Sequence, residues 1–198
     1  RSTISAPSTV CGSIFFPMAG SAAFGYSASP GSEMQALSLT PQPLTVEAFR
    51  AFGDVIEARS DTTININQGT SQRFHDLARV DVSSGDGHPL VNIFRASPYP
   101  EPLVLSMMEK HPLGSQLFMP LQDHAYLVAV AQASDKVSAG DITVFSARGN
   151  QGVNFLPGTW HHPLLVLKQQ DFLVVDRGGR GDNLVEQTLD QSVSISLV

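Results

Sequence analysis

The chain has 198 residues, enough for one domain with a sizeable core, and 42% of them are apolar, a globular composition. The formal net charge is -6 and the twelve Lys and Arg residues are scattered, which excludes the basic face that nucleic acid requires. No apolar run reaches the roughly 18 residues of a membrane span. The single cysteine, Cys11, cannot form an internal disulfide. We therefore expect a cytoplasmic protein with a small-molecule ligand, bound neither to nucleic acid nor to a membrane.

The first 33 residues differ in composition from the remainder. They are rich in Ser, Ala, Gly and Pro and carry only two charges, Arg1 and Glu33. The change in character at Met34 predicts that residues 34–198 form one domain and that residues 1–33 are an added or upstream-translated stretch outside the fold. A transit or secretory segment is the alternative.

The first regular element expected in chain order is a short helix over residues 45–53. Thr45 can cap its start, Gly53 can end it, and Val46, Phe49 and Phe52 recur on one face.

Almost everything after this helix is typical of short strands separated by turns. The segments are rich in β-branched and aromatic residues, and stretches such as Ser84-Gly85-Asp86-Gly87 lie between them. The expected strands cover residues 73–82, 90–95, 116–119, 125–131, 142–146, 153–156, 164–167 and 172–175. Many short strands without intervening helices predict an all-β sandwich or barrel with one or two short helices.

The richest chemical motif is Pro157-Gly158-Thr159-Trp160-His161-His162-Pro163. Neighbouring residues on a strand point to opposite faces, so one histidine should face the barrel interior and the other the exterior or an interface. A histidine pair after a Pro-Gly turn is a candidate for acid–base work.

The motif at residues 157–161 resembles the second histidine motif of cupin double-stranded β-barrels. The first cupin motif, two histidines and a glutamate, is only partly matched, by His111 and Gln116. A neutral amide stands where the carboxylate would fall, so His111, Gln116 and His161 form a weak ligand set. They leave room for a loosely bound, stimulatory divalent metal such as nickel and require no cofactor.

Several charged residues are candidates for binding a ligand. Arg73 and His75 lie in an Arg-Phe-His-Asp run, Arg95 lies in an apolar strand and needs an anionic partner, and Asp176 and Arg177 end another strand. For each of them a structural role is the competing interpretation.

An ordered set of segments resembles the ureidoglycolate lyase family of allantoin degradation. The set runs from about Leu39 to Glu186 and leaves out residues 1–33. It comprises residues 49–57, 66–67, 73–77, 111–116, 118–120, 152–155, 160–164 and 176–179.

This resemblance implies a dimeric cupin-type barrel that splits ureidoglycolate into glyoxylate and urea. One of His111 and His161 would be the base and the other would polarise the leaving group, while Gln116 would hydrogen-bond the substrate. An arginine, Arg73 or alternatively Arg95 or Arg177, would bind the carboxylate. His162 would orient its neighbour or close the dimer interface.

Two other functions remain open at this point. Hydrolysis of the same substrate would release ammonia and carbon dioxide, and it would ordinarily need a water-activating metal. A non-catalytic cupin that binds a small carboxylate is the second alternative.

Overall fold

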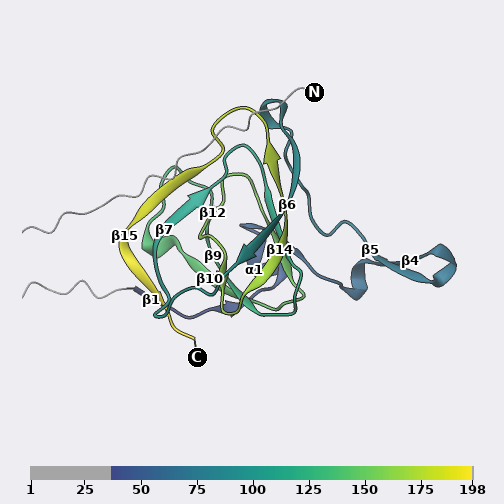
Figure 1. Cartoon of the computed structure of the whole chain (residues 1–198), viewed down its shortest axis with the longest axis horizontal. Helices are drawn as coiled ribbons and strands as arrows, with labels where there is room; N and C mark the ends of the chain where they lie inside the picture. The colour runs from purple at the N-terminus through teal and green to yellow at the C-terminus, as the bar shows by residue number, and fades with distance from the viewer. Residues whose placement is uncertain (1–36, 198) are drawn as a thin grey trace, which may run out of the picture. The chain divides into compact units, whose positions relative to one another are not determined.

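A computed structural model describes residues 37–197, which fold as a cupin-like β-barrel built from two curled sheets (Figure 1). The expected extension, residues 1–33, and its boundary at Met34 lie outside the described residues. Among those described, no helix is long and apolar enough to cross a membrane.

The larger sheet has the strand order β1-β15-β7-β12-β9-β10-β2, and β13 pairs with β9. Its strands are β1 (Leu37–Leu39), β2 (Gln42–Pro43), β7 (Val104–Lys110), β9 (Tyr126–Ala131), β10 (Thr143–Ala147), β12 (Trp160–His161), β13 (Leu165–Val166) and β15 (Val185–Ile195). The smaller sheet has the order β3-β11-β8-β14-β6. Its strands are β3 (Gly53–Ile56), β6 (His88–Ala96), β8 (Gln116–Pro120), β11 (Gly152–Phe155) and β14 (Gln170–Gly178).

A third, two-stranded sheet is a hairpin of β4 (Thr63–Ile66) and β5 (Ser71–Phe74). Figure 1 shows this hairpin extending away from the barrel strands, on the side where β6 and β14 lie. The described helices are α1 (Val46–Phe49) and the 3-10 turns η1 (Ser60–Thr62), η2 (Asn67–Gly69), η3 (Ser84–Asp86) and η4 (Ala139–Asp141).

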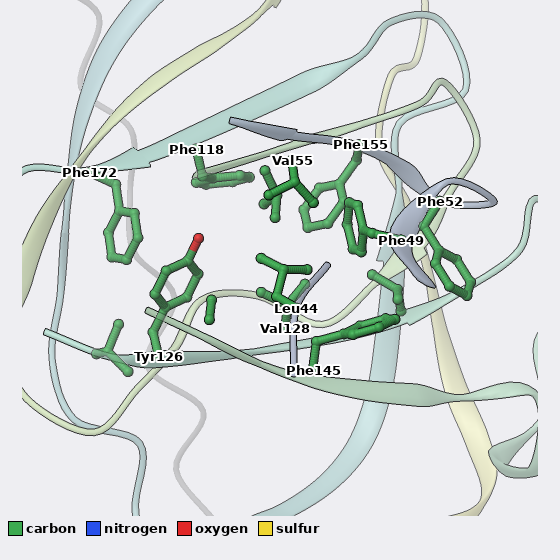
Figure 2. Close-up of a cluster of buried hydrophobic side chains, with 14 of the residues drawn as sticks. Leu44, Phe49, Phe52, Val55, Phe118, Tyr126, Val128, Phe145, Phe155 and Phe172 are labelled. Atoms are coloured by element: carbon green, nitrogen blue, oxygen red, sulfur yellow. The ribbon is translucent and has the colours of Figure 1, made fainter. Parts of the chain in front are cut away.

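The alternation of β9 divides the apolar core into two clusters. Tyr126, Val128 and Val130 point into the barrel, where they join the aromatic cluster of Figure 2. Leu127, Ala129 and Ala131 face the opposite side of the sheet and pack in a second cluster with Trp160. Both faces of β9 are therefore buried, which explains its unbroken apolar sequence.

Phe49 is the part of helix α1 that enters the barrel cluster. Its ring is fully buried and lies 5.4 Å from the ring of Phe145 and 5.8 Å from that of Phe52. We expect Phe49→Ala to lower the free energy of unfolding by about 3–5 kcal/mol, because it removes apolar contacts and leaves a cavity. Thermal or urea unfolding measures this loss, and Leu197→Ala, at a 51% exposed side chain, is the control. Equal stabilities of the two variants would contradict the assignment of Phe49 to the core.

The fold corrects two of the expected elements. The helix covers only Val46–Phe49, because Gly53 begins strand β3 beside Asn154 and Phe155, where a β-carbon on the glycine would clash with their backbone. The long strand expected over residues 73–82 ends at Phe74. Asp76 then adopts a positive φ of 56°, which ends the extended backbone.

Candidate active site

The main pocket of the barrel has a volume of about 390 Å³, and its lining includes residues of β6 and of the histidine segment that follows β12. Apolar rings form much of its wall, including Phe94, Phe118 and Phe155. Polar groups on the wall come from Glu109, Gln116, His161, His162 and Arg95. This volume and lining suit a small polar molecule held by a few directed groups.

Glu109 and His161 form the centre of the polar wall. They are directly opposite each other on β7 and β12, so their side chains share one face of the sheet. The next residues back along each strand, Met108 and Trp160, are fully buried on the other face. His161 Nε2 lies 3.4 Å from a Glu109 carboxylate oxygen, and the His161 ring stacks on Phe155 at 4.4 Å.

Backbone carbonyls fix the orientation of both inner histidines. His161 Nδ1 donates to the carbonyl of Thr159 at 3.0 Å, and His111 Nδ1 donates to that of Asn183. In the neutral imidazoles the Nε2 atoms are therefore the ones with a lone pair. Both Nε2 atoms are buried and have no hydrogen-bond partner among the described residues.

These two lone pairs converge with the carboxylate of Glu109. The ligand atoms of Glu109, His111 and His161 all lie within 4.8 Å of one another. The buried Oε1 of Gln116 also lacks a hydrogen-bond partner among the described residues and belongs to the same pocket. Such a set of acceptors can hold a proton or a divalent cation between its members.

Comparisons with known proteins show which family the chain is similar to. The sequence model of the family described as "Ureidoglycolate lyase" matches residues 36–196. A ureidoglycolate lyase of Burkholderia mallei (strain NCTC 10229) is 52% identical over 157 residues, 79% of this chain and 92% of that protein. The proteins of the same name from Brucella anthropi and from Brucella melitensis biotype 2 are 50% and 51% identical over 154 residues, 77% of this chain and 90% of each protein.

The chain belongs to the ureidoglycolate lyase family. The match covers nearly all of the described residues, and the identity is high enough to carry the fold and the enzyme class with it. This member of the ureidoglycolate lyase family is therefore a lyase built on a cupin-like barrel, as the ordered motifs predict.

Burial favours the neutral form of His111 and His162 in this member of the ureidoglycolate lyase family. Burial lowers the pKa of His111, and a charge on His161 lowers it further. Burial also lowers the pKa of His162. Burial alone would raise the pKa of Glu109, but the proximity of His161 at 3.4 Å and the charges of the nearby histidines outweigh burial, so this pKa is lowered. Near neutral pH the site therefore combines the Glu109 carboxylate with neutral His111 and His162.

The pocket gathers some of the residues predicted from the sequence and not others. His161, Gln116, His162 and Arg95 line it, and the ring of His111 lies 5.3 Å from that of His161, beside the wall. The alternation of side chains along a strand predicts that only one of His161 and His162 faces the pocket. This prediction is wrong. Strand β12 ends at His161, so the backbone turns and brings His162 to the same pocket.

The remaining charged candidates lie outside the pocket wall of their own chain. Arg73 and His75 are exposed on and just after the β4–β5 hairpin. The Asp176 carboxylate accepts a hydrogen bond from Asn92, and the buried Arg177 guanidinium donates to the carbonyls of Ser84, Gly85 and Arg180. Arg177 thus binds a turn of its own chain, which satisfies its buried charge without a ligand.

Glu109 is the site residue that the sequence interpretation missed. The ligand set expected from the sequence, His111, Gln116 and His161, contains no carboxylate, whereas the structure places the carboxylate of Glu109 beside His111 and His161. The signal was the spacing Glu109-Lys110-His111, which puts the first and third side chains on one face of a strand. Because the strand Val104–Lys110 was not expected from the sequence, the spacing of Glu109 and His111 was not interpreted as strand alternation.

The lowered pKa values of His111 and His162 predict a dependence of stability on pH. Both folded pKa values lie below the unfolded value of 6.5, so the unfolded chain binds more protons as the pH falls through 6.5. The two histidines therefore stabilise the fold above pH 6.5, and this contribution is lost as the pH falls toward their folded pKa values. We expect the Tm of the metal-free protein to fall between pH 7.5 and pH 5.5.

The double variant His111→Asn, His162→Asn tests this prediction. It should show a flatter profile of Tm against pH over the same range, because neither position can then take up a proton. A wild-type Tm that stays constant or rises on acidification would contradict the lowered pKa values.

Proposed function

We propose that this chain is a ureidoglycolate lyase that splits (S)-ureidoglycolate into glyoxylate and urea. Family membership supports this proposal, and so does the convergence of Glu109, His111 and His161 at a pocket that also presents the Gln116 amide. We further propose that it acts as a cytoplasmic homodimer in allantoin degradation.

The reaction needs a base and a hydrogen-bond donor. One carbon of the substrate carries a hydroxyl, a carboxylate and a urea nitrogen. The base removes the hydroxyl proton, the carbon–oxygen double bond forms as the carbon–nitrogen bond breaks, and the departing urea nitrogen takes up the proton that the base removed. His161 Nε2 has the required lone pair at the pocket wall, held there by Thr159 and Phe155. Gln116, which lines the same pocket, would hydrogen-bond the urea group.

The same lone pairs fit a divalent metal such as nickel. His161 Nε2 and the Glu109 oxygen lie 3.4 Å apart, close enough for both atoms to be ligands of one cation. We propose that Glu109, His111 and His161 would hold the ion, with Gln116 as a neighbour. When bound, it would lower the pKa of the substrate hydroxyl. The carboxylate of Glu109 gives this set more negative charge than His111, Gln116 and His161 alone.

Product analysis tests the proposed activity. The purified protein is incubated with (S)-ureidoglycolate, with urease excluded, and urea, glyoxylate and ammonia are quantified. We expect equal amounts of urea and glyoxylate and no ammonia. Ammonia with carbon dioxide would identify the hydrolase instead, and thermal stabilisation by glyoxylate without turnover would identify a carboxylate-binding cupin.

A further inference from the structure

The β4–β5 hairpin carries an apolar face that its own barrel does not cover. Its two strands pair with each other, and the register places Ile64 opposite Arg73 and Ile66 opposite Ser71, all on one face. The side chains of Ile64 and Ile66 are 45% and 37% exposed. A two-stranded hairpin is marginally stable in water by itself, so this face calls for a partner. Whatever covers the isoleucines must also meet Arg73.

A second exposed apolar surface lies on the outer face of the smaller sheet. Two rows run across strands β8, β14 and β6, opposite the side chains that fill the barrel. The rows are Met119, Leu173 and Ile93, and Leu117, Val175 and Val91. We call these six residues the outer rows. Their ends on β6 are the most open, with Val91 69% and Ile93 56% exposed. A continuous apolar patch of this kind marks an interaction surface.

Strand β6 connects the outer rows to the pocket. It is the last strand of its sheet, so one side of its backbone has no neighbour in the described sheet. Phe94, Arg95 and Ala96 of the same strand line the pocket. A segment that lies along β6 and covers Ile93 is therefore next to residues that line the pocket.

The pocket lacks a guanidinium that is free to bind a carboxylate. Arg95 is the one Arg or Lys among the described residues of its lining, and it makes two bonds, of 2.8 and 2.9 Å, to Asp171. The Glu109 carboxylate adds negative charge to the wall. The substrate proposed above is an anion, and a bidentate arginine is the usual partner of a carboxylate. A positively charged group from outside the chain would complement both the Glu109 carboxylate and the carboxylate of the substrate.

We propose that two copies of this chain associate through the outer rows and the β4–β5 hairpins, and that the hairpin brings the partner subunit's Arg73 to the pocket, where it binds the substrate carboxylate. Two-fold symmetry allows both apolar surfaces to be covered at once, because the hairpin of each copy can pack against the β6 edge of the other. The choice of carboxylate as ligand rests on the proposed function, whereas the interface does not.

The oligomeric state tests the interface without any assay of activity. Sedimentation of the wild type should give twice the chain mass, and Ile93→Asp should shift it to the mass of one chain, because a charge is then buried between the copies. Leu197→Asp, at a similarly exposed leucine, is the matched control and should remain a dimer. A monomeric wild type, or an Ile93→Asp variant that dimerises as the wild type does, would overturn the interface.

Mixed dimers test the position of Arg73. Arg73→Ala should raise KM by about tenfold to a hundredfold, with Arg73→Lys in between and Arg50→Ala unchanged. The Arg73→Ala and His161→Ala chains are then co-expressed with different tags, and the heterodimer is purified. If the hairpin acts across the dimer, one pocket regains both residues, so the heterodimer should show the wild-type KM with about half of the wild-type turnover per dimer.

The remaining outcomes overturn the proposal. If Arg73 served its own pocket, the pocket that keeps His161 would lack Arg73, and the heterodimer would keep the raised KM of the Arg73→Ala variant. An unchanged KM in Arg73→Ala would mean that another group, such as a bound metal ion, holds the carboxylate. If the wild type released no urea, the proposed function would fail, whereas sedimentation would still decide the interface.

Discussion

His161→Ala is expected to lower the turnover of urea release by at least about a hundredfold, because positioned acid–base groups contribute that much or more to a rate. The Nε2 atom of His161 carries a lone pair and is buried at the pocket wall. The carbonyl of Thr159 and the stacked ring of Phe155 fix the orientation of the imidazole. Steady-state kinetics with circular dichroism measures the loss against an intact fold.

The control for this variant is His124→Ala, at a histidine whose ring bonds only to the carbonyl of Asp123. It should keep wild-type turnover. His161→Asn changes the side-chain volume less than His161→Ala does but also removes the imidazole, so its turnover should be as low as that of the alanine variant. Wild-type turnover in a folded His161→Ala protein would remove His161 from the reaction.

Glu109→Gln is expected to weaken nickel binding by at least about tenfold to a hundredfold, the range that the loss of an outer-shell partner alone produces. The amide keeps the size of the side chain and removes the negative charge that faces His161 at 3.4 Å. Calorimetric titration of the chelator-treated protein with nickel gives the affinity. Urea release, assayed with and without nickel, should fall with it.

Glu47→Gln, at an exposed glutamate of helix α1, makes the same chemical change outside the pocket and should bind nickel as the wild type does. Two results would argue against Glu109 as a ligand. One is unaltered affinity in Glu109→Gln, and the other is a wild type that neither binds nickel nor responds to it. In the second case the three groups would share a proton rather than an ion.

The fold class and half of the site could be predicted from residue patterns. The short β-branched segments identify a barrel, and β9 and β14 lie within a few residues of their expected bounds. The turn and histidine run at residues 157–163 is local in the chain, so His161 could be singled out without knowledge of the fold. Gln116 follows from its spacing to His111.

What the sequence alone determined here is the class of barrel, the family and one wall of the pocket, because each is encoded in neighbouring residues. The tertiary structure decided the partner of His161. Glu109 meets it only because β7 and β12 are adjacent in the sheet, 52 positions apart along the chain, and strand pairing depends on packing of the whole barrel. The tertiary structure also shows that Arg73 lies on a separate hairpin and not in the wall of its own pocket. The position of this hairpin relative to the pocket is not specified by any local pattern of residues.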